Sequence, residues 1–398
     1  MKRIKHTVFL LLMTVSICRA ADYYVATTGS DGNPGTLSQP WLTLQHAANT
    51  AVAGDVVNVE AGTYTISSYL NLPHSGTSGS YITFQCVAQW TCTLQLASGL
   101  STGIDVNGSY VAFLNFEVIG ASDGSNSTGI KCNTGDGCKV SGNKIHHIGT
   151  TSSSCPLGAA IEPNNGNNET ITSNFIYDVS PPRSAARCNH EQGIYASGSS
   201  NNNGIIQNNV IMECYQCYAI QFDGGAPSGW TVSNNTIANV GQGSPNNSGG
   251  GIYFNCATAG ETCNNMVFNN NIFYNTGGDS CITEATVATG GTNGTQNKYS
   301  NNLFSNCFGG NNLINGSLSN SVNANPLFVN YTGSQTGDYH VLAGSPAIDA
   351  GTATEAPATD FDGIARSGGI WIGAYQSSGS GTSTQPPNPP AGLQAVVN

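Results

Sequence analysis

The chain has 398 residues, of which 8% are charged and 50 are glycine, and its formal net charge is −11. Because glycine is unfavourable in helices and few side chains are charged, this composition argues against a mainly helical protein and against a disordered polyelectrolyte. The negative charge argues against binding to the phosphates of nucleic acids.

Residues 1–20 have the pattern of a secretory signal peptide, with a basic start, an apolar run over Val8–Cys18 and a small residue at Ala20. The apolar run is too short to span a membrane. We therefore expect a secreted, extracellular or cell-surface protein, monomeric and without a membrane span. Without this segment, 7 Lys and Arg remain against 22 Asp and Glu, which gives a net charge of −15.

Residues 21–100 are interpreted as an N-terminal cap and the first coils of a solenoid. Within them, the apolar residues of Leu42–Val52 recur with helical spacing just before a predicted strand over Asp55–Glu60. Because a stacked fold must cover the open end of its core, this segment predicts an N-terminal capping helix.

Residues 101–325 repeat one pattern about every 30 residues. A small residue followed by isoleucine recurs at Gly129-Ile130, Ala160-Ile161, Gly193-Ile194, Ala219-Ile220, Gly251-Ile252 and Cys281-Ile282. An Asn-x-aliphatic pattern follows each of them, at Asn143, Asn174, Asn209, Asn235, Asn270 and Asn301. Coils of this length hold three short strands, so we predict an all-β, single-stranded right-handed parallel β-helix. The asparagines are expected to stack as an internal ladder at one bend.

The repeated isoleucines are expected to point into the core, so the residues one and three positions later point outward. The two outer columns are Lys131, Glu162, Tyr195, Gln221, Tyr253 and Thr283, and Asn133, Asn164, Ser197, Asp223 and Asn255. The residues at the position between these columns should return to the core and are mostly apolar. Glu284 departs from this pattern, which argues against the same register in the last coil.

Twelve cysteines follow the signal segment, and in a secreted protein they are expected to form disulfides. Eight of them lie close together in pairs, namely Cys86 and Cys92, Cys132 and Cys138, Cys214 and Cys217, and Cys256 and Cys263. The Cys214-x-x-Cys217 pair also permits a metal or redox role, but no second CxxC or nearby histidine completes a zinc site. The sequence does not fix the connectivity.

Residues 326–376 are interpreted as a C-terminal closing region, and residues 377–398 as a linker rich in Ser, Gly and Pro with a truncated tail. The start Tyr23–Ala26 and the closing segments Asn325–Phe328 and Gly344–Gly351 resemble the pectate-lyase-like right-handed parallel β-helix superfamily, including secreted bacterial members with a variable C-terminal anchor region. The resemblance implies an architecture that carries lyases, hydrolases, epimerases and non-enzymes. It also implies that a polysaccharide lies across the outward face of one sheet, under the loops that enter it.

The loop before Gly193 gathers titratable residues, which are scarce elsewhere in the chain. Beta-elimination at a uronate needs positive charge beside the substrate carboxylate and a base for the C5 proton. Arg187, His190 and Lys131 are therefore assigned as catalytic residues, and Arg183, Tyr195, Gln221 and Tyr253 as substrate-binding residues. Glu162, Glu191 and Asp223 are assigned as ligands of a hard cation such as Ca²⁺.

These residues also allow a structural interpretation, in which Arg187 pairs with Glu191 and the tyrosines are ordinary strand residues. Three functions remain open: a polysaccharide lyase, a non-catalytic carbohydrate-binding or adhesive surface protein, and a glycoside hydrolase that uses Glu162 with Asp223 or Glu191. The His146-His147 pair lies on another face and is interpreted as a surface pair in preference to a metal site.

Overall fold

The computed structural model describes residues 20–376, apart from gaps at 123, 151–157, 181–190, 199–200, 226, 243–248, 257–259, 279 and 286–291. The signal segment, the linker and the loop with Arg183, Arg187 and His190 therefore lie outside the described residues. Among the residues that are described, none belongs to a helix long and apolar enough to cross a membrane.

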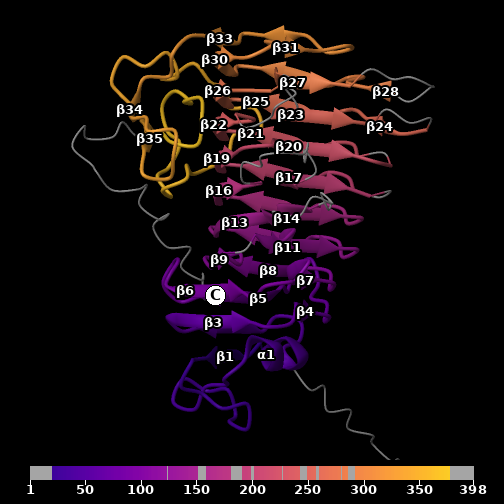
Figure 1. Ribbon diagram of the computed structural model, residues 1–398, viewed down its shortest axis with the longest axis vertical. Helices are drawn as coiled ribbons and strands as arrows, with labels where there is room; N and C mark the ends of the chain where they lie inside the picture. The colour runs from indigo at the N-terminus through magenta and orange to yellow at the C-terminus, as the bar shows by residue number, and fades with distance from the viewer. Residues whose placement is uncertain are drawn as a thin grey trace, which may run out of the picture.

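Three parallel sheets run along the molecule, and the chain passes through them in turn as it winds upward (Figure 1). The first sheet contains β1 (Asp22–Val25), β2 (Val56–Val59), β5 (Ile82–Cys86), β8 (Val111–Leu114), β12 (Lys139–Ser141), β15 (Thr170–Thr172), β18 (Ile205–Gln207), β21 (Thr231–Ser233), β25 (Val267–Asn269), β29 (Lys298–Ser300) and β32 (Leu318–Ser319). The second contains β3 (Gly62–Ile66), β6 (Cys92–Leu96), β9 (Glu117–Ile119), β13 (Lys144–Thr150), β16 (Phe175–Val179), β19 (Val210–Cys214), β22 (Thr236–Val240), β26 (Ile272–Thr276), β30 (Leu303–Cys307) and β33 (Val322–Asn323), with β10 (Ser125–Asn126) antiparallel to β13. The third contains β4 (Leu70–Leu72), β7 (Thr102–Val106), β11 (Thr128–Asn133), β14 (Gly158–Asn164), β17 (Glu191–Ser197), β20 (Tyr218–Asp223), β23 (Gly250–Asn255), β27 (Ser280–Glu284) and β31 (Asn311–Asn312). Two outlying strands, β24 (Thr262–Cys263) and β28 (Thr292–Asn293), pair with each other.

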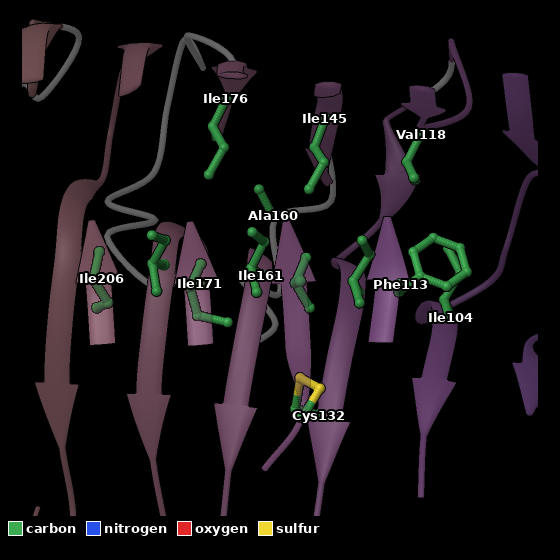
Figure 2. Close-up of a cluster of buried hydrophobic side chains, with 14 of the residues drawn as sticks. Ile104, Phe113, Val118, Cys132, Ile145, Ala160, Ile161, Ile171, Ile176 and Ile206 are labelled. Carbon is green, nitrogen blue, oxygen red and sulfur yellow. A yellow bond between two sulfur atoms is a disulfide. The ribbon is translucent and has the colours of Figure 1, made fainter. Parts of the chain in front are cut away.

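The predicted isoleucine series is confirmed as one column of the third sheet. The six isoleucines pair in register, at separations of 31, 33, 26, 32 and 30 residues. All six are fully buried in a core to which all three sheets contribute side chains. Figure 2 shows this core around Ile161. The fold is therefore an all-β parallel solenoid of about 30 residues per coil.

The expectation that Glu284 interrupts this register is wrong. Phe254 pairs with Glu284, so the column continues through β27 with a carboxylate inside the core. Glu284 is fully buried and accepts hydrogen bonds from the Tyr299 hydroxyl at 2.6 Å and from the Asn315 backbone N–H at 2.9 Å. A buried carboxylate is tolerated here because donors surround it.

The asparagine ladder exists, but its last two members were assigned one residue too early. The buried side-chain amides run from Asn143 through Asn174, Asn209 and Asn235 to Asn271 and Asn302, each donating to the next at 3.0–3.1 Å. Asn270 and Asn301 instead precede the ladder residues, with left-handed backbone at φ 58° and 53°. The sequence pattern had placed Ile272 and Leu303 in the inward column that contains Ile237. In the structure Phe273 and Phe304 occupy that column, which moves the ladder position one residue along the chain.

The predicted N-terminal capping helix is not supported. The single α-helix of the described residues is α1 (Leu44–Thr50), which has only seven residues. It buries Leu44, Ala47 and Ala48 against the first coils, and Gln45 bonds to the backbone of Asn71 on β4. The helix stops early because Ala51 is extended and the Asp55 carboxylate accepts from the Val52 N–H, which turns the chain into β2.

Residues 326–376, here called the C-terminal layer, fold back over the outer face of the second sheet, which is the yellow segment beside β19 to β30 in Figure 1. The layer contains the antiparallel pair β34 (Phe328–Asn330) and β35 (Asp338–Val341). Its apolar side chains pack on outward residues of the sheet, namely Phe175, Tyr177, Val210, Met212, Ala238, Ile272 and Leu303. Arg366 fixes the layer by donating to the Asn208 side chain at 2.8 Å.

All four close cysteine pairs form disulfides, Cys86–Cys92, Cys132–Cys138, Cys214–Cys217 and Cys256–Cys263, and a fifth joins Cys281 to Cys307. Cys214 and Cys217 therefore bind each other and no metal ion. Most of these bonds close a turn of six or seven residues, which limits the freedom of the unfolded chain.

Candidate functional site

The outward face of the third sheet carries one continuous line of polar and aromatic side chains, here called the outer row. Neighbouring strands place its members one above another because each follows a buried isoleucine of the paired column. In order along the stack these are Asp105, Lys131, Glu162, Tyr195, Gln221, Tyr253 and Thr283. The predicted site residues that the structure describes therefore lie on one surface.

Lys131 and Glu162 form an ion pair across β11 and β14, with Nζ 2.8 Å from Oε1. The other oxygen of Glu162 accepts from the Thr128 hydroxyl at 3.2 Å, and Asn164 donates to Oε1 at 3.2 Å. The Glu162 side chain is 9% exposed and that of Lys131 is 25% exposed, so the ammonium is the part of the pair that faces solvent. The carboxylate is thus placed to orient the lysine.

Asp223 is the centre of a second group, two strands further along the stack. It accepts hydrogen bonds from the Tyr195 hydroxyl at 2.8 Å, from Gln221 Nε2 at 3.1 Å and from Asn255 Nδ2 at 3.1 Å. Burial raises the pKa of Asp223 above its usual value, although these donors oppose the shift. Burial and the nearby Asp223 carboxylate also raise the pKa of Tyr195, which keeps its phenol protonated as a donor.

Tyr253 is the last aromatic member of the outer row, with Thr283 of β27 beside it, and stacks on Tyr218 of β20 with ring centroids 4.4 Å apart. Tyr218, which sequence reasoning did not select, precedes the isoleucine column by two residues. Tyr195 and Gln221 are each only 7% exposed, whereas Tyr253 is partly exposed. Tyr253 is therefore the ring of this group that is most available to a sugar.

Asp105 is a charged member of the outer row that the sequence analysis missed. It pairs in register with Lys131, and its Oδ1 atom is buried without a hydrogen-bond partner among the residues that the structure describes. Gly103-Ile104 has the same small-residue and isoleucine pattern as the later coils, and it lies 26 residues before Ile130. Extending the repeat by one coil would have identified Asp105.

The described carboxylates do not converge on one point that could hold Ca²⁺. Glu162 and Asp223 lie on β14 and β20, separated by β17, and each is occupied by its own donors. The side chain of Glu191 and the residues Arg183, Arg187 and His190 are outside the described part. Within that part, no group of three or more His, Cys, Asp or Glu residues is arranged to hold a metal ion.

Comparison with known proteins gives two short sequence matches and a similar solved structure. The chain is 46% identical over 67 residues to the uncharacterized protein YwoF of Bacillus subtilis (strain 168), a stretch covering 17% of this chain and 14% of that protein. It is 39% identical over 61 residues to pectate lyase PEL9 of Emericella nidulans, which covers 15% of each. The chain thus spans about one-seventh of the length of either relative, and no family model matches it.

The solved structure of pectate lyase Pel9A matches 91% of this chain and 98% of its own, with a TM-score of 0.51 and 14% sequence identity. At this identity the match informs the fold and leaves the chemistry open. Together with the three parallel sheets, it identifies the architecture. The chain has the pectate-lyase-like parallel β-helix fold.

Proposed function

We propose that this protein is a secreted, carbohydrate-active enzyme that cleaves an acidic polysaccharide by β-elimination. The observation that carries the proposal is the outer row with the adjoining Asp223, which together present a lysine–glutamate pair, a half-buried aspartate and tyrosines on one face of the solenoid. Beta-strand β17 begins at Glu191, directly after residues 181–190. β17 itself lies between β14, which carries Glu162, and β20, which carries Gln221.

In the proposed reaction, positive charge stabilises the uronate carboxylate while a base removes the C5 proton. The Lys131 ammonium, oriented by Glu162, supplies one positive charge on the described surface. Arg187 and Arg183 supply further charge, and His190 acts as the base. Tyr253, with Gln221 beside it, contacts the sugar rings. No step is assigned to Ca²⁺, because the described carboxylates do not form a site for it.

The similarity to two pectate lyases supports this proposal, one through the fold and one through a short stretch of sequence. A second candidate is a non-catalytic carbohydrate-binding or adhesive surface protein. It is favoured by a regular chain of side-chain amides on the same face, in which Asn133 donates to Asn107 at 3.0 Å and Asn107 donates to Asn71 at 2.8 Å. Amide groups of this kind can bind sugar hydroxyls without any chemistry.

The deciding experiment incubates the protein with polygalacturonate, alginate and glycosaminoglycans, with calcium or with a chelator, and follows the ultraviolet absorbance of unsaturated products. We expect unsaturated product on at least one uronate polymer. Binding without any product would favour the surface protein, and release of reducing sugar without unsaturation would favour a glycoside hydrolase.

Two variants test the assigned residues. Arg187→Ala is expected to abolish activity and leave thermal unfolding unchanged, and full activity in this variant would remove the loop from the site. Lys131→Gln is expected to lower the activity strongly. Its matched control is Lys144→Gln, which breaks a similar ion pair to Glu117 at 2.6 Å with the lysine side chain 26% exposed, on the second sheet. Equal losses in both variants would indicate a general effect on folding.

A further inference from the structure

The His146-His147 pair lies on β13 of the second sheet, away from the outer row. Successive residues of a strand normally point to opposite faces, but His147 has left-handed backbone at φ 57°, which brings both imidazoles together. His146 is only 6% exposed and stacks on Tyr177, with centroids 4.5 Å apart and planes 10° apart. The expectation of a simple surface pair is therefore wrong for His146.

A carboxylate holds the outer nitrogen of each imidazole. His146 Nε2 lies 3.3 Å from Glu117 Oε1, and His147 Nε2 lies 3.3 Å from Asp178 Oδ2. A carboxylate oxygen accepts the N–H of an imidazole, so these two contacts favour the tautomer of each ring in which Nε2 carries the hydrogen and Nδ1 carries the lone pair.

This arrangement leaves the two inner nitrogens facing each other. The Nδ1 atoms of His146 and His147 are 2.5 Å apart. If both Nε2 atoms carry hydrogen and both rings are neutral, two lone pairs meet at this contact, which is repulsive. A cation between them removes the repulsion, and it is either a proton or a metal ion. Histidines that bind metals commonly donate their other ring N–H to a carboxylate, as both rings do here.

We propose that His146 and His147 bind a transition-metal ion of the Cu²⁺ or Zn²⁺ type through their Nδ1 atoms, with water as the remaining ligands. Imidazole nitrogen suits these ions. Only two protein ligands are involved, which agrees with the absence of any three-residue metal group among the described residues. Zinc–nitrogen bonds of about 2.0–2.1 Å at a tetrahedral angle place the two nitrogens about 3.3 Å apart. This spacing is wider than the 2.5 Å between the two Nδ1 atoms. His147, whose side chain is 50% exposed, can move outward to reach it, while Tyr177 and Glu117 hold His146 in place.

The test is titration of the full chain, prepared without a histidine tag, with Cu²⁺ alone and with Zn²⁺ alone by calorimetry. Electron paramagnetic resonance of the Cu²⁺ form reports the number of bound nitrogens. We expect one ion per chain and coupling to two nitrogens. His147→Ala should weaken binding at least tenfold, and Glu117→Gln, which keeps the shape of the side chain, should weaken it by about 10- to 100-fold. The matched control is His74→Ala, which removes an exposed histidine from another part of the surface and should leave the affinity unchanged.

Binding that is equally strong in the wild type, His147→Ala and Glu117→Gln would overturn the proposal by placing the ion elsewhere. Absence of binding would also overturn it and would leave a shared proton as the cation. In that case, nitrogen chemical shifts of the two imidazoles should show one imidazolium and one neutral ring. Thermal unfolding of each variant in the absence of metal separates a lost ligand from a lost fold. Neither outcome depends on whether the protein cleaves a polysaccharide.

Discussion

Glu169 carries a carboxyl group that is buried in the core. The residue is fully buried, and neither carboxyl oxygen accepts a hydrogen bond from another of the described residues. In the stack of coils, Glu169 lies between Cys138 of the preceding coil and Gly204 of the following coil. The ring of Trp230 occupies the space where a side chain on Gly204 would lie. Burial, with a smaller contribution from the negative charge of Asp136, raises its pKa from 4.5 to about 8. Glu169 is therefore protonated in the folded protein at neutral pH and ionised in the unfolded chain.

The consequence for stability has a definite sign. Between pH 4.5 and 8 the folded state binds more protons than the unfolded state, so the free energy of unfolding falls as the pH rises through this window. One pKa unit corresponds to about 1.4 kcal/mol, so the loss between pH 4 and pH 7 amounts to about 3 kcal/mol. Replacing Glu169 by glutamine, which has nearly the same shape and does not ionise, should remove this loss.

The assay is denaturant unfolding of the wild type and Glu169→Gln at pH 4, 5.5, 7 and 8.5, followed by circular dichroism. We expect the variant to gain about 3 kcal/mol relative to the wild type between pH 4 and pH 7. Glu355→Gln, a change at an exposed glutamate, serves as the control and should show no such trend. A constant difference between Glu169→Gln and the wild type at every pH would refute the reasoning, because it would mean that the carboxyl has the same charge in both states.

Two further predictions concern the C-terminal layer and the asparagine ladder. Burial opposes ionisation of His340, but hydrogen bonds to Asp338 at 2.7 Å and Asp362 at 2.8 Å raise its pKa to about 9. Its stabilisation is complete below pH 6.5 and is lost as the pH rises to about 9, so the advantage of the wild type over His340→Gln should shrink by about 3 kcal/mol across this range in thermal or denaturant unfolding. Asn235→Ala should cost about 2–4 kcal/mol in the same assay, because it leaves the Asn209 amide and the Ile206 carbonyl without their buried partner. A loss below about 0.5 kcal/mol would show that the ladder contributes little to stability.

The third sheet could be predicted from the sequence because a small residue followed by a buried isoleucine recurs in its strands without interruption from Ile130 to Ile282. A register shift by a single residue would move every isoleucine from the core to the surface, so the alignment of Ile130 to Ile282 has one solution. The asparagine ladder is less constrained where asparagines adjoin, as in 269–271 and 301–302. There the choice depends on whether Ile272 or Phe273 points inward, and only the packing of the core decides this.

The C-terminal layer was not predicted to cover the second sheet, although the sequence contains a sign of it. The run Val210-Ile211-Met212 is apolar at every position, which is typical of a strand buried on both faces. Ile211 enters the core of the solenoid, whereas Val210 and Met212 pack under the C-terminal layer. The apolar run does not reveal which segment covers this strand. The segment that does so, residues 326–376, lies more than a hundred positions further along the chain.

The charges of the outer row restrict how an acidic substrate could bind. Asp105, Glu162 and Asp223 lie on this surface with a single cation, Lys131, so the described residues alone would repel a chain of uronates. Of the other basic residues that follow the signal segment, Lys139 and Lys298 lie on the first sheet, Lys144 on the second and Arg366 in the C-terminal layer. Only Arg183 and Arg187 remain. If the proposed lyase activity is correct, this loop must therefore supply the compensating charge, either through its arginines or by holding a cation. An enzyme that acted equally well without both arginines and in the presence of a chelator would have to act on a neutral polysaccharide.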